Sequence, residues 1–412
     1  MNKNWIVIIS LSLVCAIVVW LFEALGGKSL ILKLLSRKEY LKRRWEKDQQ
    51  KMKKTRRDPE TYRFLSHYYS EYPLLQMYGK SFPVTVFQAP HCQTNNIESA
   101  LGSLERLPDD DFAFSDERYF KLLKASGRKL YNGRLFTIKE IKLIPKLSVE
   151  CGTGRYFDCQ KTCDALEYEL LKEFGVSHTQ EQNSETISKR LPHRRTLHEK
   201  VNDPVIQGAG RSAALAVSVL IVFNHSNEYQ ALIMKRAGKV AVHDNLFHVI
   251  PSFMMEYEVE DFAHEFKVTH NIFREYTEEL FDYNFTGTKI FYDYFYSDPR
   301  LKFLQEILQR NDASLYYTGI TVNLLNLRPE ICALLLIRSP DWFVYHTSHQ
   351  PFKFNWEFLS EREAWEEEKR GLLLVDLYDE NTLAKFIMPE TVVPPAASAI
   401  YLGLALARKI LA

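Results

Sequence analysis

Cysteine is scarce in this chain. Its 412 residues include six cysteines, which are Cys15, Cys92, Cys151, Cys159, Cys163 and Cys332. So few thiols in a chain of this length do not form the disulfide framework of a small secreted domain, and we expect them to be reduced. Cys151, Cys159 and Cys163 lie close in the sequence, but their spacing matches no zinc motif.

An excess of charge of either sign is also missing. The 53 Lys and Arg residues nearly balance the 52 Asp and Glu residues, which leaves a net charge of +1. This balance gives no reason to expect nucleic acid as a partner of the whole molecule. Hydrophobic residues make up 46% of the chain, which predicts a folded protein, and the length predicts two or three domains.

One long hydrophobic run stands at the start of the chain. Residues 5–25 read WIVIISLSLVCAIVVWLFEAL, and the uncharged stretch from Asn4 to Phe22 has about the length that crosses a hydrocarbon core of roughly 30 Å. Trp5 and Trp20 lie towards its two ends, where indole rings favour the membrane interface. A cleaved signal peptide is the alternative, but its apolar region would be shorter and lead to a small-residue cleavage site. We predict a single transmembrane anchor at 1–27.

A basic segment follows this run. Residues 28–57 hold thirteen Lys and Arg residues against three acids, which predicts a single-pass protein of the cell membrane with the bulk of the chain in the cytoplasm. Apolar residues at helical spacing, among them Tyr40, Leu41 and Trp45, predict a helix here. This helix either lies along membrane lipid headgroups or is solvated, and both interpretations stay open.

Residues 58–178 predict an α+β region whose role the sequence does not reveal. The stretch 133–158 alternates as strands do, and 163–174 has helical periodicity. The GTGRYF stretch at 152–157 lacks the strand–glycine–helix context of a dinucleotide site. Residues 179–210 are polar and close with glycines, which is typical of a linker.

The remaining residues, 211–412, predict a mixed β-sheet with helices, so the expected fold class is α+β. A long apolar strand is followed by a turn, HSNE, and a second strand, which together predict a hairpin. The expected strands are 214–224, 229–237, 245–255 and two within 314–339, and the expected helices are 261–282, 361–377 and 396–412. The last helix has too few apolar residues before Arg408 for a second membrane span.

The helix predicted at 261–282 carries an unusual set of acids. On a helical wheel, aromatic and aliphatic side chains form one stripe, and Glu275, Glu278, Glu279 and Asp282 gather on the other side. Glu275 is one turn from both Glu278 and Glu279, and like charges at this spacing destabilise a helix. The acids are therefore either a solvated face or a site for a hard divalent cation such as Mg²⁺ or Mn²⁺.

The order of hairpin, strand, proline-containing loop and acidic helix resembles the Nudix hydrolase superfamily. The second half of that family's signature is Arg-Glu-apolar-x-Glu-Glu-x-Gly, which Arg274, Glu275, Tyr276, Glu278 and Glu279 match. VIPSF, at 249–253, stands where the family has a Pro-Gly-Gly turn, and LIMKRA resembles the strand before it. The signature departs from the family in three ways: Phe253 replaces the first glycine, Glu265 lies nine residues before Arg274 instead of eight, and Phe281 replaces the last glycine.

The resemblance implies hydrolysis of a diphosphate linkage in a nucleoside diphosphate-type substrate. It implies that Glu275, Glu278 and Glu279 hold Mg²⁺ or Mn²⁺ and that Glu278 and Glu279 are catalytic. Glu330, at the start of a strand, is expected to add a further ligand or base from a loop, and Arg274 to orient the glutamates. Lys235 and Arg236 are expected to bind substrate phosphate.

A second hypothesis stays open. The altered glycine loop favours a Nudix-like protein without catalysis, which senses a nucleotide and signals through its membrane anchor, as an antiphage-type effector does. The sequence leaves open whether the chain is an enzyme and whether copies of it assemble.

Overall fold

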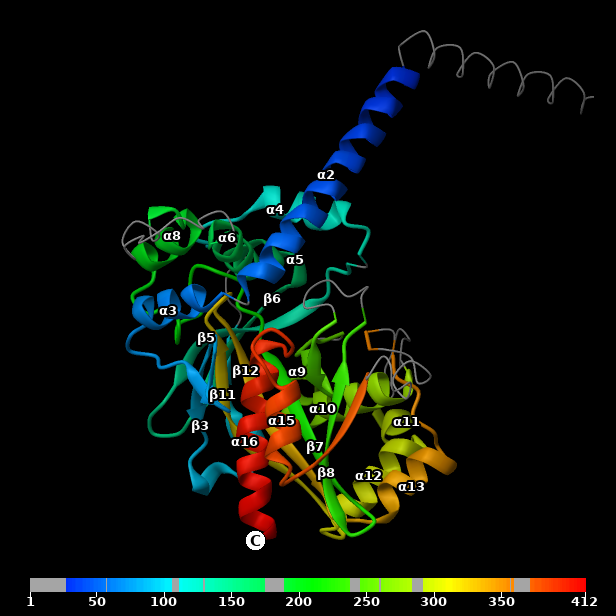
Figure 1. Ribbon diagram of the computed structural model, residues 1–412. Helices are drawn as coiled ribbons and strands as arrows, with labels where there is room; N and C mark the ends of the chain where they lie inside the picture. The colour runs from blue at the N-terminus through cyan, green and yellow to red at the C-terminus, as the bar shows by residue number, and fades with distance from the viewer. Residues whose placement is uncertain are drawn as a thin grey trace, which may run out of the picture.

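The computed structural model describes residues 27–412 except 57, 106–110, 129, 175–188, 238–244, 259–260, 284–291, 356 and 359–370. Several helices gather at one end of the molecule (Figure 1). They are α2 (Gly27–Thr55), α3 (Pro59–Tyr68), α4 (Glu117–Ala125), α5 (Tyr156–Cys159), a π-helical turn (Gln160–Asp164), α6 (Ala165–Phe174) and α8 (Pro192–Lys200). A three-stranded sheet lies with them, in the order β4 (Leu101–Leu104), β6 (Ser148–Arg155), β5 (Arg134–Lys142). Two very short strands, β1 (Leu75–Met77) and β2 (Lys80–Phe82), form a separate hairpin.

The larger sheet is mixed and contains the strands predicted for the second half of the chain. Its path is β13 (Leu372–Asp376), β8 (Glu228–Lys235), β7 (Ala216–His225), β12 (Arg328–Ile337), β11 (Ala313–Asn323), β3 (Val84–Gln88). β12 runs parallel to β7, and its other neighbour, β11, is antiparallel. The β7–β8 hairpin turns at Ser226 and Asn227, which both have positive φ, as the favoured two-residue turns require. β3 belongs to the first half of the chain, so the sheet unites residues from both sides of the expected linker.

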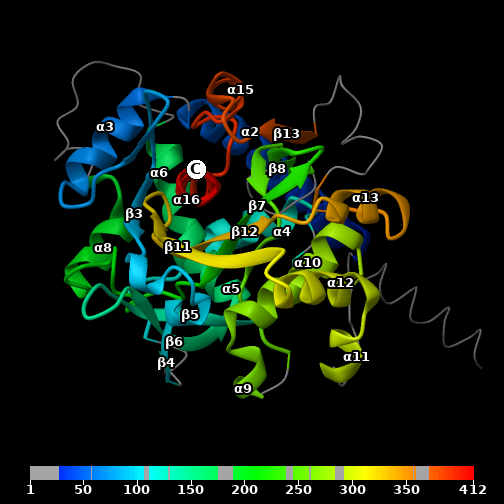
Figure 2. The same ribbon diagram turned by 90° about the horizontal axis from the view of Figure 1, so that it is seen from below.

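Helices cover both faces of this sheet (Figure 2). α16 (Pro394–Leu411), predicted from the sequence, packs on one face, where Leu220 and Leu334 share a buried cluster with Ile400. Gly403 permits this close approach, because a Cβ there would lie 2.7 Å from Cδ2 of Leu220. The other face carries α10 (Val268–Phe281), α12 (Pro299–Gln309) and α13 (Asp341–Ser348). The fold is therefore α+β with mixed sheets, as predicted.

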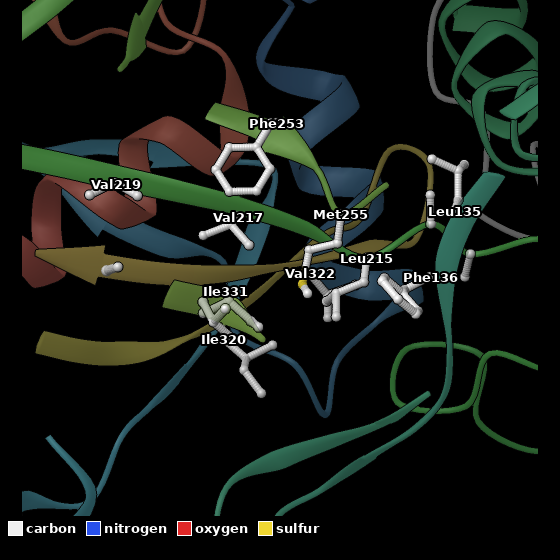
Figure 3. Close-up of a cluster of buried hydrophobic side chains, with 14 of the residues drawn as sticks. Leu135, Phe136, Leu215, Val217, Val219, Phe253, Met255, Ile320, Val322 and Ile331 are labelled. Carbon is white, nitrogen blue, oxygen red and sulfur yellow. The ribbon is translucent and has the colours of Figure 1, made fainter. Parts of the chain in front are cut away.

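The two sheets share one hydrophobic core. The Phe136 backbone N–H of β5 donates to the Met255 carbonyl at 2.9 Å, and the Leu215 N–H donates to the Phe136 carbonyl at 2.9 Å. Figure 3 shows Leu135 and Phe136 close to Leu215 and Met255 in the buried cluster. β5 thus lies against the segments that enter β7 and leave β10 (Ser252–Met254).

The structure contradicts two linked predictions. These are the single N-terminal transmembrane helix and the location in the cell membrane. In the ranges described, which begin at residue 27, no helix combines the length and the apolar character that crossing a membrane requires. α2 is long but densely charged. The anchor expected at 1–27 lies outside the described residues except for its last residue.

The basic helix α2 contacts protein along its C-terminal half. Trp45, expected to face lipid or solvent, is buried, and its ring centroid lies 6.1 Å from that of Tyr119 on α4. The Tyr168 hydroxyl of α6 donates to Oδ2 of Asp48 at 2.5 Å. The apolar side of this half therefore completes the core of the molecule.

Three predicted elements differ in the structure. Residues 372–376 form the strand β13, not the end of a helix, and 359–370 lie outside the described residues. The strand expected at 245–255 is two short strands, β9 (Phe247–Val249) and β10, on either side of Pro251, which has no N–H to donate. The helix expected at 261–282 is broken into α9 (Phe262–Glu265) and α10, because Lys267 is extended. Tyr292–Tyr296 (α11) and Glu380–Phe386 (α15) are two further helices.

The described part of the expected linker, 189–210, packs against the sheet. Fully buried Arg194 on α8 donates to the Tyr69 hydroxyl and, at 3.1 and 2.6 Å, to the carbonyls of Leu324 and Leu325. Arg211 donates to the Leu327 carbonyl at 3.1 Å and to two carbonyls of its own loop. We call Arg194 and Arg211 the arginine clamp, because both hold the turn between β11 and β12.

Candidate functional site

α10 is fixed at both ends and along one side. The backbone N–H groups of Val268 and Thr269, at its start, donate to the carboxylate of Glu98 at 2.9 and 2.8 Å. The helix ends at Asp282, whose backbone is left-handed. Buried Tyr276 and Leu280 attach it to the core. The acids of α10 are therefore presented by a helix with little freedom to move.

Arg274 lies among acids and is itself buried. Its guanidinium is 3.5 Å from Oε2 of Glu265 and 3.4 Å from Oε1 of Glu275, and it donates to Oδ1 of Asn271 at 2.9 Å. It also donates to the Glu256 carbonyl at 3.3 Å. Arg274 is thus positioned to orient glutamates.

The three glutamates of α10 are buried or half-buried, and the solvated acidic face does not form. Oε2 of Glu279 accepts a hydrogen bond from the Ser252 backbone N–H at 2.9 Å, and this side chain is buried. Burial raises the pKa of Glu275 to about 8, against the opposing effect of Arg274. Burial also raises the pKa of Glu278, and raises that of Glu279 well above its usual range. Burial therefore shifts each of these carboxyl groups towards the protonated form, and Glu275 and Glu279 the most.

Two further acids join these three, and sequence reasoning missed both. Glu256 follows β10, and burial raises its pKa to about 7 against Arg274, with smaller contributions from Glu278 and Glu357. A Cβ on Gly133 would lie 2.9 Å from Oε2 of Glu256, so the start of β5 borders this group. Glu357 raises the pKa of Glu275, Glu278 and Glu279 as well. We call Glu256, Glu275, Glu278, Glu279 and Glu357 the carboxylate cluster.

Glu265 was also missed as a partner of Arg274. It is fully buried, and its Oε1 accepts a hydrogen bond from the Tyr292 hydroxyl at 3.0 Å. The only signal in the sequence was its place shortly before Arg274, and the break between α9 and α10 brings it to the guanidinium despite the extra residue.

The two predicted basic residues differ in their surroundings. Nη2 of Arg236 is 2.8 Å from Oε2 of Glu357, and Arg236 lowers the pKa of Glu279. Lys235 has its ammonium group 5.8 Å from the centre of the Phe247 ring. The structure therefore connects Arg236, but not Lys235, with the carboxylate cluster.

Glu330 lies within β12, not in a loop. It is buried, and its Oε1 is hydrogen-bonded to Oγ of Ser218 on β7. Burial raises its pKa, against Ser218, Arg328 and Arg236. Arg236 lowers the pKa of both Glu330 and Glu279.

The carboxylate cluster offers the oxygen donors that Mg²⁺ and Mn²⁺ prefer. Across the described ranges, no three His, Cys, Asp or Glu side chains are placed together as a set that could hold a metal ion. Glu275 interacts with Arg274, and Glu279 with the Ser252 N–H. The residues thus match a divalent cation in the kind of donor they provide, but the described side chains are not gathered into a coordinating set.

The chain matches none of the protein-family models and none of the curated proteins with which it was compared.

Proposed function

We propose that this protein is a Nudix-like hydrolase that depends on a divalent metal and cleaves a diphosphate linkage in a nucleoside diphosphate-type substrate. The observation that carries the proposal is the carboxylate cluster, in which one fixed helix presents Glu275, Glu278 and Glu279. Arg274 holds Glu275 and the Ser252 N–H holds buried Glu279. The mixed sheet between helices, with α10 after a proline-containing turn, supports it.

The residues present have distinct roles in this proposal. A cation held by Glu275, Glu278 and Glu279 would supply positive charge to the cluster and lower the pKa of water. Arg274 holds Glu275, and the Ser252 N–H holds Glu279, so that both carboxylates keep their directions. Arg236 turns from Glu357 to a phosphate oxygen when substrate binds, and Glu330 accepts a proton.

The test uses the full chain with Mg²⁺ or Mn²⁺ and a panel of nucleoside diphosphate sugars, dinucleotide polyphosphates and nucleoside diphosphates. We expect metal-dependent turnover of at least one compound, and loss of about 100-fold or more in kcat in Glu278→Gln and Glu279→Gln. Glu306→Gln, on the exposed side of α12, is the matched control and should keep full activity.

A non-catalytic nucleotide sensor is the second candidate function. It is favoured by the loop at 250–254, where Phe253 is buried in the core and no glycine is present. Stabilisation of the chain by a nucleotide, measured as a rise in Tm without release of any product, would select the sensor and reject the hydrolase.

A further inference from the structure

Three buried polar side chains at the π-helical turn and at the start of β12 have hydrogen-bonding atoms to spare. Nε2 and Oε1 of Gln160, Oδ2 of Asp164 and Nε of Arg328 have no hydrogen-bond partner among the described residues. Gln160 is fully buried, Asp164 is 4% exposed, and the side chain of Arg328 is 13% exposed. We call these residues the polar triad. Because a buried polar group without a partner costs free energy, the polar triad points to a ligand that completes its hydrogen bonds.

The members of the polar triad are neighbours. Nη1 of Arg328 is 3.5 Å from Oδ1 of Asp164. Gln160 lowers the pKa of Asp164, so its amide lies beside that carboxyl group, although no hydrogen bond of good geometry joins the two. Burial raises the pKa of Asp164 to about 6 against Arg328, so at about pH 8 the carboxylate accepts hydrogen bonds and donates none.

Glu167, three residues after Asp164, is a buried acid whose hydrogen bonds are complete. Its Oε1 accepts from Nη2 of Arg56 at 2.6 Å, and its Oε2 accepts from Nδ2 of Asn326 at 3.1 Å. Both of its oxygens therefore have partners in the fold, whereas Asp164 has a partner for one oxygen only among the described residues. The difference separates a structural acid from an acid with capacity left for a ligand.

The polar triad adjoins the proposed hydrolytic site. Arg328 stands two residues before Glu330 on β12. The helix that leads into the π-helical turn begins at Tyr156, whose backbone N–H donates to the Gly133 carbonyl at 3.1 Å, and Gly133 in turn borders Glu256 of the carboxylate cluster. Tyr156 and Arg328 are partly exposed, so solvent reaches the polar triad beside them.

The spare atoms form an ordered pattern of donors and acceptors. When the Gln160 amide is turned with its oxygen towards Asp164, the order is a donor and an acceptor from Gln160, an acceptor from Asp164 and a donor from Arg328. The complementary edge is acceptor, donor, donor, acceptor. Guanine presents this edge with O6, N1–H, its 2-amino group and N3, whereas adenine has a C–H group opposite Asp164.

We propose that the polar triad binds the guanine base of the nucleotide substrate. The Gln160 amide pairs with O6 and N1–H, Oδ2 of Asp164 accepts from the 2-amino group, and Nε of Arg328 donates to N3. This inference rests on the proposed function, which supplies the class of ligand, and it adds the identity of the base. Binding uses every spare atom of the polar triad and breaks no covalent bond.

The first test needs neither metal nor turnover. The full chain is titrated calorimetrically, at about pH 8 with EDTA present, with guanosine, inosine and adenosine, which carry no phosphate and so avoid the carboxylate cluster. We expect guanosine to bind about 10-fold more tightly than inosine, which lacks the 2-amino group, and about 100-fold more tightly than adenosine, because each mismatch leaves buried groups unpaired. Equal affinities for guanosine and adenosine, or no binding of guanosine, would overturn the proposal.

The second test looks for a gain of affinity, which misfolding does not produce. In Asp164→Asn, an amide donor faces the base where the carboxylate accepted. Affinity for guanosine should fall by about 10-fold, and affinity for xanthosine, whose 2-oxo group accepts, should rise by about 10-fold over the wild type. Glu167→Gln is the matched control, since it changes a buried acid on the same helix and should keep the preference for guanosine. An unchanged preference in Asp164→Asn, or the same switch in Glu167→Gln, would overturn the proposal.

The two proposals fail in different ways. If no compound of the panel is turned over but guanosine is preferred and the switch occurs, the hydrolase is rejected and the base site stands. If turnover occurs with equal kcat/KM for guanosine and adenosine compounds and the nucleosides bind equally, the hydrolase stands and the base site is rejected.

Discussion

The arginine clamp and the carboxylate cluster are both buried groups of like charge, and they differ in what surrounds those charges. Arg194 and Arg211 donate to carbonyl groups and to one tyrosine hydroxyl, so most of their hydrogens have partners in the fold. The acids of the cluster instead raise one another's pKa, and Arg274 and Arg236 offset this only in part. A buried charged group whose hydrogen-bond partners are backbone carbonyls has a structural role. Buried carboxyl groups that lie near other carboxyl groups are instead suited to bind a cation.

The largest effect is expected from breaking the clamp. Arg194→Met removes the donors for the carbonyls of Leu324 and Leu325, which stay buried, and should lower the free energy of unfolding by about 3–5 kcal/mol. Urea denaturation measures this. Arg195→Met is the control, since Arg195 is half exposed and its ion pair with Glu199, at 3.7 Å, is exposed too; its change should stay within about 0.5 kcal/mol. Equal effects of both variants would contradict a structural role for the clamp.

The next effect is a loss of stability with rising pH that originates in the cluster. The pKa of Glu256 is raised to about 7 and that of Glu275 to about 8, so in the folded state both carboxyl groups keep protons that the unfolded chain has already lost. These two groups contribute their full stabilisation below the pKa of a glutamate in the unfolded chain. That contribution is lost as pH rises through the folded-state pKa values of about 7 and about 8. Between about pH 6.5 and 8.5 the free energy of unfolding should fall by about 2 kcal/mol.

A matched variant isolates this decline. Buried His270 and His346 have their pKa lowered by burial to about 3 and about 4, so in the folded state they stay neutral in this range. Because the same histidines in the unfolded chain still lose protons near pH 6.5, they add a small rise in stability that opposes the decline. His193, paired with Asp116, has a raised pKa and adds a decline of the same sign. Glu275→Gln should flatten the curve relative to the wild type, and saturating Mg²⁺ should do the same. Parallel curves for the variant and the wild type would show that Glu275 does not hold its proton in the folded state.

The contrast between clamp and cluster also shows what a sequence can predict. β7, β8, β11, β12 and α16 followed from long apolar runs and from turn residues between them. The break before α10 did not, because Phe266 fits the apolar stripe of one long helix. It instead packs on Phe136 of β5, with 5.0 Å between ring centroids. β13 was mistaken for a helix because its apolar run was joined to the acidic stretch before it, although Gly371 separates the two.

The candidate site divides in the same way. Glu275, Glu278 and Glu279 are visible in the sequence because helical spacing alone brings them together. Three other acids are brought to the site by tertiary structure: Glu256 after the strand β10, Glu265 at the break between α9 and α10, and Glu357 in a loop. No local sequence pattern predicts that these side chains lie close to α10. The sequence did not predict the arginine clamp for the same reason. The segment around Arg194 is polar, as linkers are, and the backbone carbonyls that Arg194 binds are far away in the sequence.

A smaller effect, of opposite sign to the clamp, is expected at Glu279. Glu279→Gln keeps an oxygen that accepts from the Ser252 N–H. It also removes the need to take up a proton on folding, because burial beside Glu275 and Glu357 raises the pKa of Glu279 well above its usual range. The metal-free chain should become more stable by about 1 kcal/mol. Mg²⁺ should raise the Tm of the wild type and leave that of the variant nearly unchanged, because only the former gains binding energy. If Glu279→Gln is less stable than the wild type, Glu279 has a structural role like that of Arg194 and Arg211.

The smallest effect sharpens the comparison within one helix. Glu98 is also a carboxylate beside α10, but it accepts from two backbone N–H groups at the start of the helix, where negative charge is favourable. Glu98→Gln should therefore lower the free energy of unfolding by about 0.5 kcal/mol, and Mg²⁺ should raise its Tm as in the wild type. Two Glu→Gln changes around α10 would then shift stability in opposite directions. If both substitutions change the free energy of unfolding in the same direction, the hydrogen-bond partners of a buried acid do not tell whether its role is structural or cation-binding.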